Sequence, residues 1–103
     1  MPESVMIDAV RYAILRVKEP LLLEGRECNA MVEYNTAQIK MLEGGNIGEG
    51  NKAKLLMHEI VHAVLFERGL TEHAGDEELV SELAAGFVNL VRANPQLIAF
   101  LQK

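Results

Sequence analysis

The stretch Leu55-Leu56-Met57-His58-Glu59-Ile60-Val61-His62-Ala63-Val64 combines an apolar, helix-like pattern with an H-E-x-x-H pentad at positions 58–62. Residues four apart lie on one face of an α-helix, so His58 and His62 can each direct a ring nitrogen at one Zn²⁺. Glu59 projects beside them, where its carboxylate can take a proton from a metal-bound water. An unpaired polar group in an apolar setting costs about 1–3 kcal/mol, and one metal ion would satisfy all three. The pentad therefore predicts a hydrolytic zinc site.

Size and composition restrict the class of protein. The 103 residues suit a single domain, residues 1–103, with an aliphatic core, because half of them are hydrophobic and Trp is absent. The net charge of −5, without a basic run, argues against direct nucleic-acid binding. There is no apolar run of the ~20 residues that span a bilayer, no signal-peptide pattern, and only one cysteine, Cys28. We expect a cytoplasmic protein without membrane contact, with Cys28 packed in a strand.

The first half of the chain predicts a small sheet. Residues 3–11 suit a short helix or an extended lead-in, residues 12–17 a strand, and residues 21–26 a loop. Segments on either side of the Asn35-Thr36 turn, residues 27–34 and 37–42, predict an antiparallel hairpin. The sheet is expected to be rich in antiparallel pairs and to contain about three strands.

The second half of the chain predicts helices. Glycine-rich residues 43–50 favour a flexible loop, Asn51 an N-cap, and Gly69 the end of the pentad helix. Further helices are expected from about Asp76 to Ala93 and over residues 96–102, with Pro95 between them. A sheet followed by the pentad helix and a second helix that bears a ligand makes an α+β, zincin-like domain.

A catalytic zinc needs a third protein ligand. The metzincin arrangement places a histidine six residues after the second one, but that position is Arg68. Glu77 continues the apolar stripe that the second helix is expected to bury, and it lies in the first turn, where the helix dipole favours a carboxylate. We therefore favour Glu77, with Glu78 as the second choice. The other candidates are His73, Asp76 and Glu82.

These motifs resemble the ImmA/IrrE-type zinc metallopeptidases, gluzincins often encoded on phages and other mobile elements. The resemblance rests on Glu33-Tyr34-Asn35, the strand Gln38-Ile39-Lys40-Met41, the pentad, and Glu77-Glu78-Leu79-Val80-Ser81-Glu82-Leu83-Ala84 in place of the second family signature. It covers roughly residues 12–93. It implies Glu77 as the third ligand and places Ser81 where the family has a residue that supports a ligand histidine.

The resemblance implies a metallopeptidase that cleaves a protein or peptide substrate, with a repressor as one such partner. Glu59 would act as general base, and Tyr34 or His73 could donate a hydrogen bond to the tetrahedral oxyanion. In zincins the substrate adds to a sheet edge above the pentad helix, which suggests residues Gln38, Ile39, Lys40 and Met41 as the substrate-binding strand.

Other interpretations stay open at this stage. The domain could bind zinc without catalysis and only recognise a protein partner, or it could lack a metal altogether. A latent form, with residues 96–103 covering the cleft, is a further alternative. Glu59 favours activity, because a silent site would be free to lose it. The sequence leaves the oligomeric state open.

Overall fold

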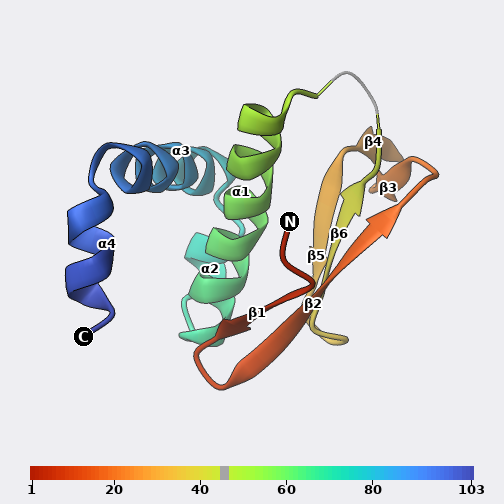
Figure 1. Cartoon of the computed structure of the whole chain (residues 1–103). Coiled ribbons are helices and arrows are strands. Elements are labelled where there is room, and N and C mark those ends of the chain that lie inside the picture. Colours follow the sequence, from red (N-terminus) through yellow and green to blue (C-terminus); the bar gives the residue numbers. More distant parts are fainter. Residues whose placement is uncertain (45–46) are drawn as a thin grey trace.

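The computed structural model describes residues 1–44 and 47–103, and within them the chain forms an α+β fold (Figure 1). The strands are β1 (Ser4–Ile7), β2 (Val10–Val17), β3 (Leu21–Leu23), β4 (Arg26–Cys28), β5 (Ala30–Glu33) and β6 (Gln38–Leu42). The helices are α1 (Glu49–Glu67), α2 (Thr71–Ala74), α3 (Glu77–Ala93) and α4 (Pro95–Leu101). The expected order of a sheet followed by helices is confirmed.

Four strands form one mixed sheet in the order β1-β2-β6-β5. β1 is antiparallel to β2, β2 is parallel to β6, and β6 is antiparallel to β5. The expectation of about three strands was therefore too low. Residues 3–11 resolve to the extended alternative, with Asp8 at φ 52° in the turn from β1 to β2. Residues 21–26 are not a plain loop, because β3 and β4 pair as a separate antiparallel ribbon.

The predicted edge strand is in the middle of the sheet. β6 pairs with β2 on one side and with β5 on the other, so its backbone cannot accept a further strand. Ile39 and Met41 are buried against the helices. The assignment of Gln38–Met41 as the substrate-pairing strand is therefore wrong. The sequence did not predict this position, because the pairing of β6 with the parallel strand β2 is non-local. Within the described residues, β1 and β5 form the edges of this sheet.

One face of the sheet packs against α1 (Figure 1). Inward-facing residues alternate along the central strands, as a half-buried sheet requires: Tyr12 and Ile14 on β2, Ile39 and Met41 on β6. Side chains along one side of α1 complete this core: Leu55, Leu56, Ile60, Ala63 and Val64.

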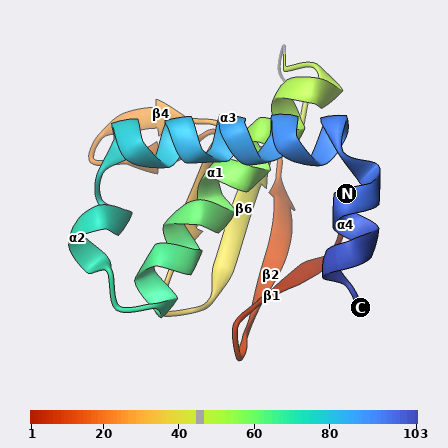
Figure 2. The same ribbon diagram turned by 90° about the vertical axis from the view of Figure 1, so that its left-hand side faces the viewer.

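A second, smaller core joins α1 to α3. Val61 packs against Val80 and Ala84, with Met57, Leu65 and Leu83 around them. The stripe expected on α3 has the right phase, but Phe87 and Val91 are exposed and Val88 is buried instead. The physical reason is that α3 crosses α1 at an angle, so the side of α3 that contacts α1 changes along its length: Val88 is buried, and Arg92 donates to Gly50 O at the start of α1 (Figure 2).

The ends of α1 are set by glycines. The helix begins at Glu49 after Gly48, one turn earlier than the expected N-cap at Asn51. Its end follows the expectation: Gly69 has φ 80°, the Gly69 N–H donates to Phe66 O at 3.0 Å, and the Leu70 N–H donates to Leu65 O at 2.8 Å. This Schellman arrangement satisfies carbonyls of the last turn and reverses the chain towards α2.

Among the described residues, no helix combines the length and the apolar character that crossing a bilayer requires.

Tyr12 links the sheet to the end of α1. Its side chain is fully buried and its hydroxyl donates a hydrogen bond to the Glu67 carboxylate. We expect Tyr12→Phe to lower the free energy of unfolding by about 1.5–3 kcal/mol, because the carboxylate loses its donor. Urea denaturation measures this change. Glu67→Gln, which keeps an acceptor, should cost less; a Tyr12→Phe protein as stable as the parent would contradict the role of this bond.

Candidate metal centre

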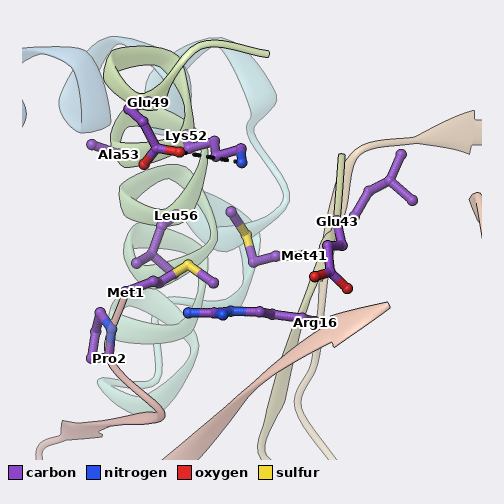
Figure 3. Close-up of a pocket in the computed structure, with 10 residues that line it drawn as sticks. Met1, Pro2, Arg16, Met41, Glu43, Glu49, Lys52, Ala53 and Leu56 are labelled. Atoms are coloured by element: carbon purple, nitrogen blue, oxygen red, sulfur yellow. Dashed lines mark hydrogen bonds and ion pairs between the residues drawn. The ribbon is translucent and has the colours of Figure 1, made fainter. Parts of the chain in front are cut away.

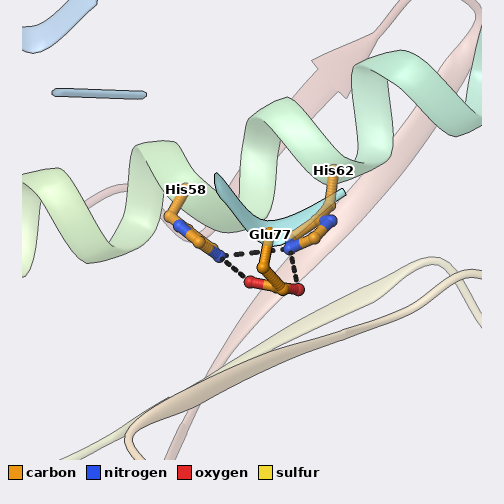
Figure 4. A group of neighbouring side chains, drawn as sticks. All are labelled: His58, His62 and Glu77. Atoms are coloured by element: carbon orange, nitrogen blue, oxygen red, sulfur yellow. Dashed lines mark hydrogen bonds and ion pairs between the residues drawn. The ribbon is translucent and has the colours of Figure 1, made fainter. Parts of the chain in front are cut away.

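Three side chains from two helices converge on one point (Figure 4). His58 and His62 extend from adjacent turns of α1, and Glu77 is the first residue of α3. Glu77 Oε2 lies 3.0 Å from His58 Nε2, and Glu77 Oε1 lies 2.9 Å from His62 Nε2. The two Nε2 atoms are 3.1 Å apart. The residues expected as ligands thus form a His/His/Glu group that can hold a metal ion.

The outer nitrogen of each histidine has its own partner. The buried Nδ1–H of His62 donates to the carbonyl oxygen of Ala74. A carbonyl can only accept, so the proton of neutral His62 sits on Nδ1 and its Nε2 presents a lone pair. Nδ1 of His58 lies 3.3 Å from Ser81 Oγ, which can accept a hydrogen bond from the Nδ1–H in the same way. Such contacts fix the tautomer and the ring orientation of metal-binding histidines.

The donor set fits a cation. Two imidazole lone pairs and two carboxylate oxygens face one another at about 3 Å, and they repel unless a positive charge lies between them. Tetrahedral ligands ~2.0–2.1 Å from a zinc ion lie roughly 3.3 Å apart, so the observed group is only slightly contracted. Imidazole and carboxylate donors suit Zn²⁺ and its first-row neighbours. Three protein ligands leave one position for water.

The connection between α1 and α3 places the third ligand. After Gly69 reverses the chain, the single turn of α2 buries Ala74 and directs its carbonyl at His62. Asp76 then caps α3, and its carboxylate accepts the Leu79 N–H at 3.1 Å. This cap makes Glu77 the first helical residue and turns its side chain back towards α1.

Glu59 is the buried acid of the site. Its exposed fraction is 6%, and no side chain of residues 1–44 and 47–103 pairs with its carboxylate. Burial and the nearby Glu77 charge raise the pKa of Glu59 to about 7. A carboxyl group with this pKa exchanges protons readily at neutral pH, as a general base must. Glu77 differs, because 69% of its side chain is exposed and the group opens to solvent on its side.

β5 passes close to Glu59. Desolvation raises the pKa of Cys28, just before β5, and of Tyr34, just after it. The nearby Glu59 charge raises both pKa values further. The Tyr34 ring stacks on Phe66 of α1, with ring centroids 4.1 Å apart and planes 6° apart. A raised pKa keeps the Tyr34 phenol protonated at neutral pH, so it can donate a hydrogen bond.

The other ligand candidates lie outside the group. Asp76 is used as the cap of α3, and His73, Glu78 and Glu82 are exposed. Sequence reasoning missed the Ala74 carbonyl, because a backbone acceptor leaves no residue-type signal. It also missed β5 as the edge beside Glu59.

A cavity of about 380 Å³ lies elsewhere, between the first turns of α1 and the ends of β2 and β6 (Figure 3). Its lining includes Arg16, Met41, Lys52 and Leu56, and none of the three residues of the His/His/Glu group. The candidate metal centre therefore lies on the open surface beside α3 and not in this cavity.

Comparisons of the chain with protein-family models, with curated proteins and with solved structures find no match.

Metal binding should depend on three residues. We expect one Zn²⁺ per chain by isothermal titration calorimetry. His58→Ala, His62→Ala and Glu77→Ala should each weaken binding by at least about 100-fold, because two ligands do not hold the ion. His73→Ala and Glu78→Ala are matched controls and should bind as the parent does. Equal loss in a control, or none in the ligand variants, would contradict the assignment.

Ser81 should support His58 without touching the ion. We expect Ser81→Ala to lower the affinity for Zn²⁺ by about 10–100-fold, as loss of an outer partner does elsewhere. Competition with a chromophoric chelator measures the change. Ser81→Thr keeps the hydroxyl and should retain most of the affinity; an unchanged affinity in Ser81→Ala would show that the 3.3 Å contact orients nothing.

Proposed function

We propose that this protein is a zinc-dependent metallopeptidase with a zincin-like domain. The observation that carries the proposal is the convergence of His58, His62 and Glu77 within hydrogen-bonding distance, beside the buried carboxylate of Glu59. Each histidine also has an outer partner, which a ligand histidine requires and a chance surface pair does not. A bound Zn²⁺ would lower the pKa of a water towards ~7 and polarise a carbonyl group.

The chain's own residues then supply the proton transfers. Glu59 accepts the proton of the attacking water and delivers it to the leaving amine. The buried setting of Glu59 suits both steps, because desolvation brings its pKa to about 7. Tyr34 is the favoured donor to the developing oxyanion, because Phe66 holds its ring and its phenol remains protonated. His73, the other candidate donor, is exposed on α2.

The substrate is proposed to be an extended peptide or protein segment that pairs with β5. This strand is an edge of the four-stranded sheet, and Glu59 influences residues at both of its ends. Backbone pairing with an edge strand supplies affinity that is independent of sequence. A peptide on β5 would therefore run beside the general base, which replaces the earlier assignment to residues 38–41.

The resemblance to the ImmA/IrrE-type gluzincins supports the same class of activity and adds a setting: a cytoplasmic enzyme of a phage or mobile element acting on a protein such as a repressor. The latent alternative loses its structural basis, because α4 packs on α3 at the end opposite to Glu77 (Figure 2). The remaining alternative is a zinc-binding domain that recognises a partner without cleaving it.

Glu59→Gln separates the two alternatives. We expect this variant to bind Zn²⁺ like the parent and to cleave at least about 100-fold more slowly, because the amide cannot accept the proton. Denatured casein and a mixed peptide library serve as probes, with products identified by mass spectrometry. Glu78→Gln is the matched control and should keep the parent rate. Equal cleavage by Glu59→Gln and parent would remove the peptidase proposal.

A further inference from the structure

The C-terminal part of the chain has an exposed apolar surface that the proposed catalysis does not use. Its members lie on the second half of α3 and on α4, and all are at least one-third exposed; Phe100 and Leu101 reach 66%. We call it the C-terminal apolar face, and it comprises Phe87, Leu90, Val91, Leu97, Phe100 and Leu101.

The face continues a stripe that is core elsewhere. Val80 and Ala84 of α3 are buried against α1, and Phe87 and Val91 follow them at helical spacing. They are exposed because the second half of α3 contacts α1 through another side of the helix, where Val88 is buried and Arg92 reaches Gly50 (Figure 2). Phe87 and Val91 are each 43% exposed, so the described residues cover them only in part.

The apolar side chains of α4 are also incompletely covered. This helix has seven residues, none of them buried, and it packs against α3 (Figure 1). So short a helix is not stable in water by propensity, and its stability must come from packing of its apolar side chains. The two most exposed of these, Phe100 and Leu101, are covered over only about a third of their surface.

Charge is almost absent here. Residues 83–101 contain one charged side chain, Arg92, and none of the 15 acidic residues. The Arg92 guanidinium donates to Gly50 O at 3.2 Å, so it is directed towards the start of α1. A helix that lies on a membrane surface typically carries Lys and Arg along its polar side, which α4 does not.

We infer that the C-terminal apolar face is the contact between two copies of this chain. The six side chains present on the order of 500 Å² of apolar surface per copy. Two copies joined there would bury about 1,000 Å² in total if the whole face were covered, which is the lower limit for a specific interface. A two-fold contact uses the same patch on both chains, and here it keeps the acids of two chains with net charge −5 apart.

The test is the mass in solution, measured by sedimentation equilibrium on the metal-free and Zn²⁺-loaded protein. At tens of micromolar we expect twice the 11.4 kDa chain mass. Phe100→Glu on α4 and Leu90→Glu on α3 should each raise the dimer dissociation constant by at least about 30-fold, because each buries an unpaired charge at the contact. Circular dichroism should show both variants folded.

Leu22→Glu is the matched control, because Leu22 is 64% exposed on β3, far from this face in the sheet layer. It should leave the mass unchanged. A monomeric parent overturns the inference, including the case in which the face binds lipid vesicles or a different protein. A parent dimer that survives both Glu substitutions, or that Leu22→Glu dissociates, overturns it too. The measured mass does not depend on peptide cleavage, so the test of the dimer is independent of the proposed activity.

Discussion

The burial of α1 along two separate stripes is the constraint from which the rest of the molecule follows. Ile60 and Ala63 face the sheet, and Val61 faces α3. Because residues advance by about 100° around a helix, His58 and His62 lie on the side of α1 opposite to Ile60, beyond the Val61 stripe. The histidines are therefore held on a helix that packing fixes on both sides, while their Nε2 atoms remain open towards Glu77.

The contact between His62 and Ala74 connects this packing to the chemistry of the site. It ties a ring on α1 to the backbone of the turn that leads into α3. The same turn positions Asp76, whose cap sets the first residue of α3 as Glu77. One buried hydrogen bond thus orients a histidine and also fixes the approach of the third side chain. Both effects depend on Gly69, whose positive φ lets the chain reverse.

Local features were predictable from the sequence, and non-local pairing was not. The spacing of His58 and His62 is fixed by helix geometry alone, and the helical phase of α3 distinguished Glu77 from Glu78. By contrast, the central place of β6 arises from its parallel pairing with β2, twenty or more residues away in the chain. The exposure of Phe87 and the burial of Val88 depend on the angle at which α3 crosses α1, which the periodicity of α3 does not encode.

Two carboxylates of one site occupy different environments, and the difference follows from position. Glu59 lies next to the sheet core and is 6% exposed, so desolvation favours its neutral form and raises its pKa. Glu77 begins α3 at the surface, and 69% of its side chain is exposed. An exposed carboxylate beside two histidines suits metal ligation, and a buried acid with a raised pKa suits proton transfer. Burial therefore separates two side chains of the same chemistry in the way that their proposed roles require.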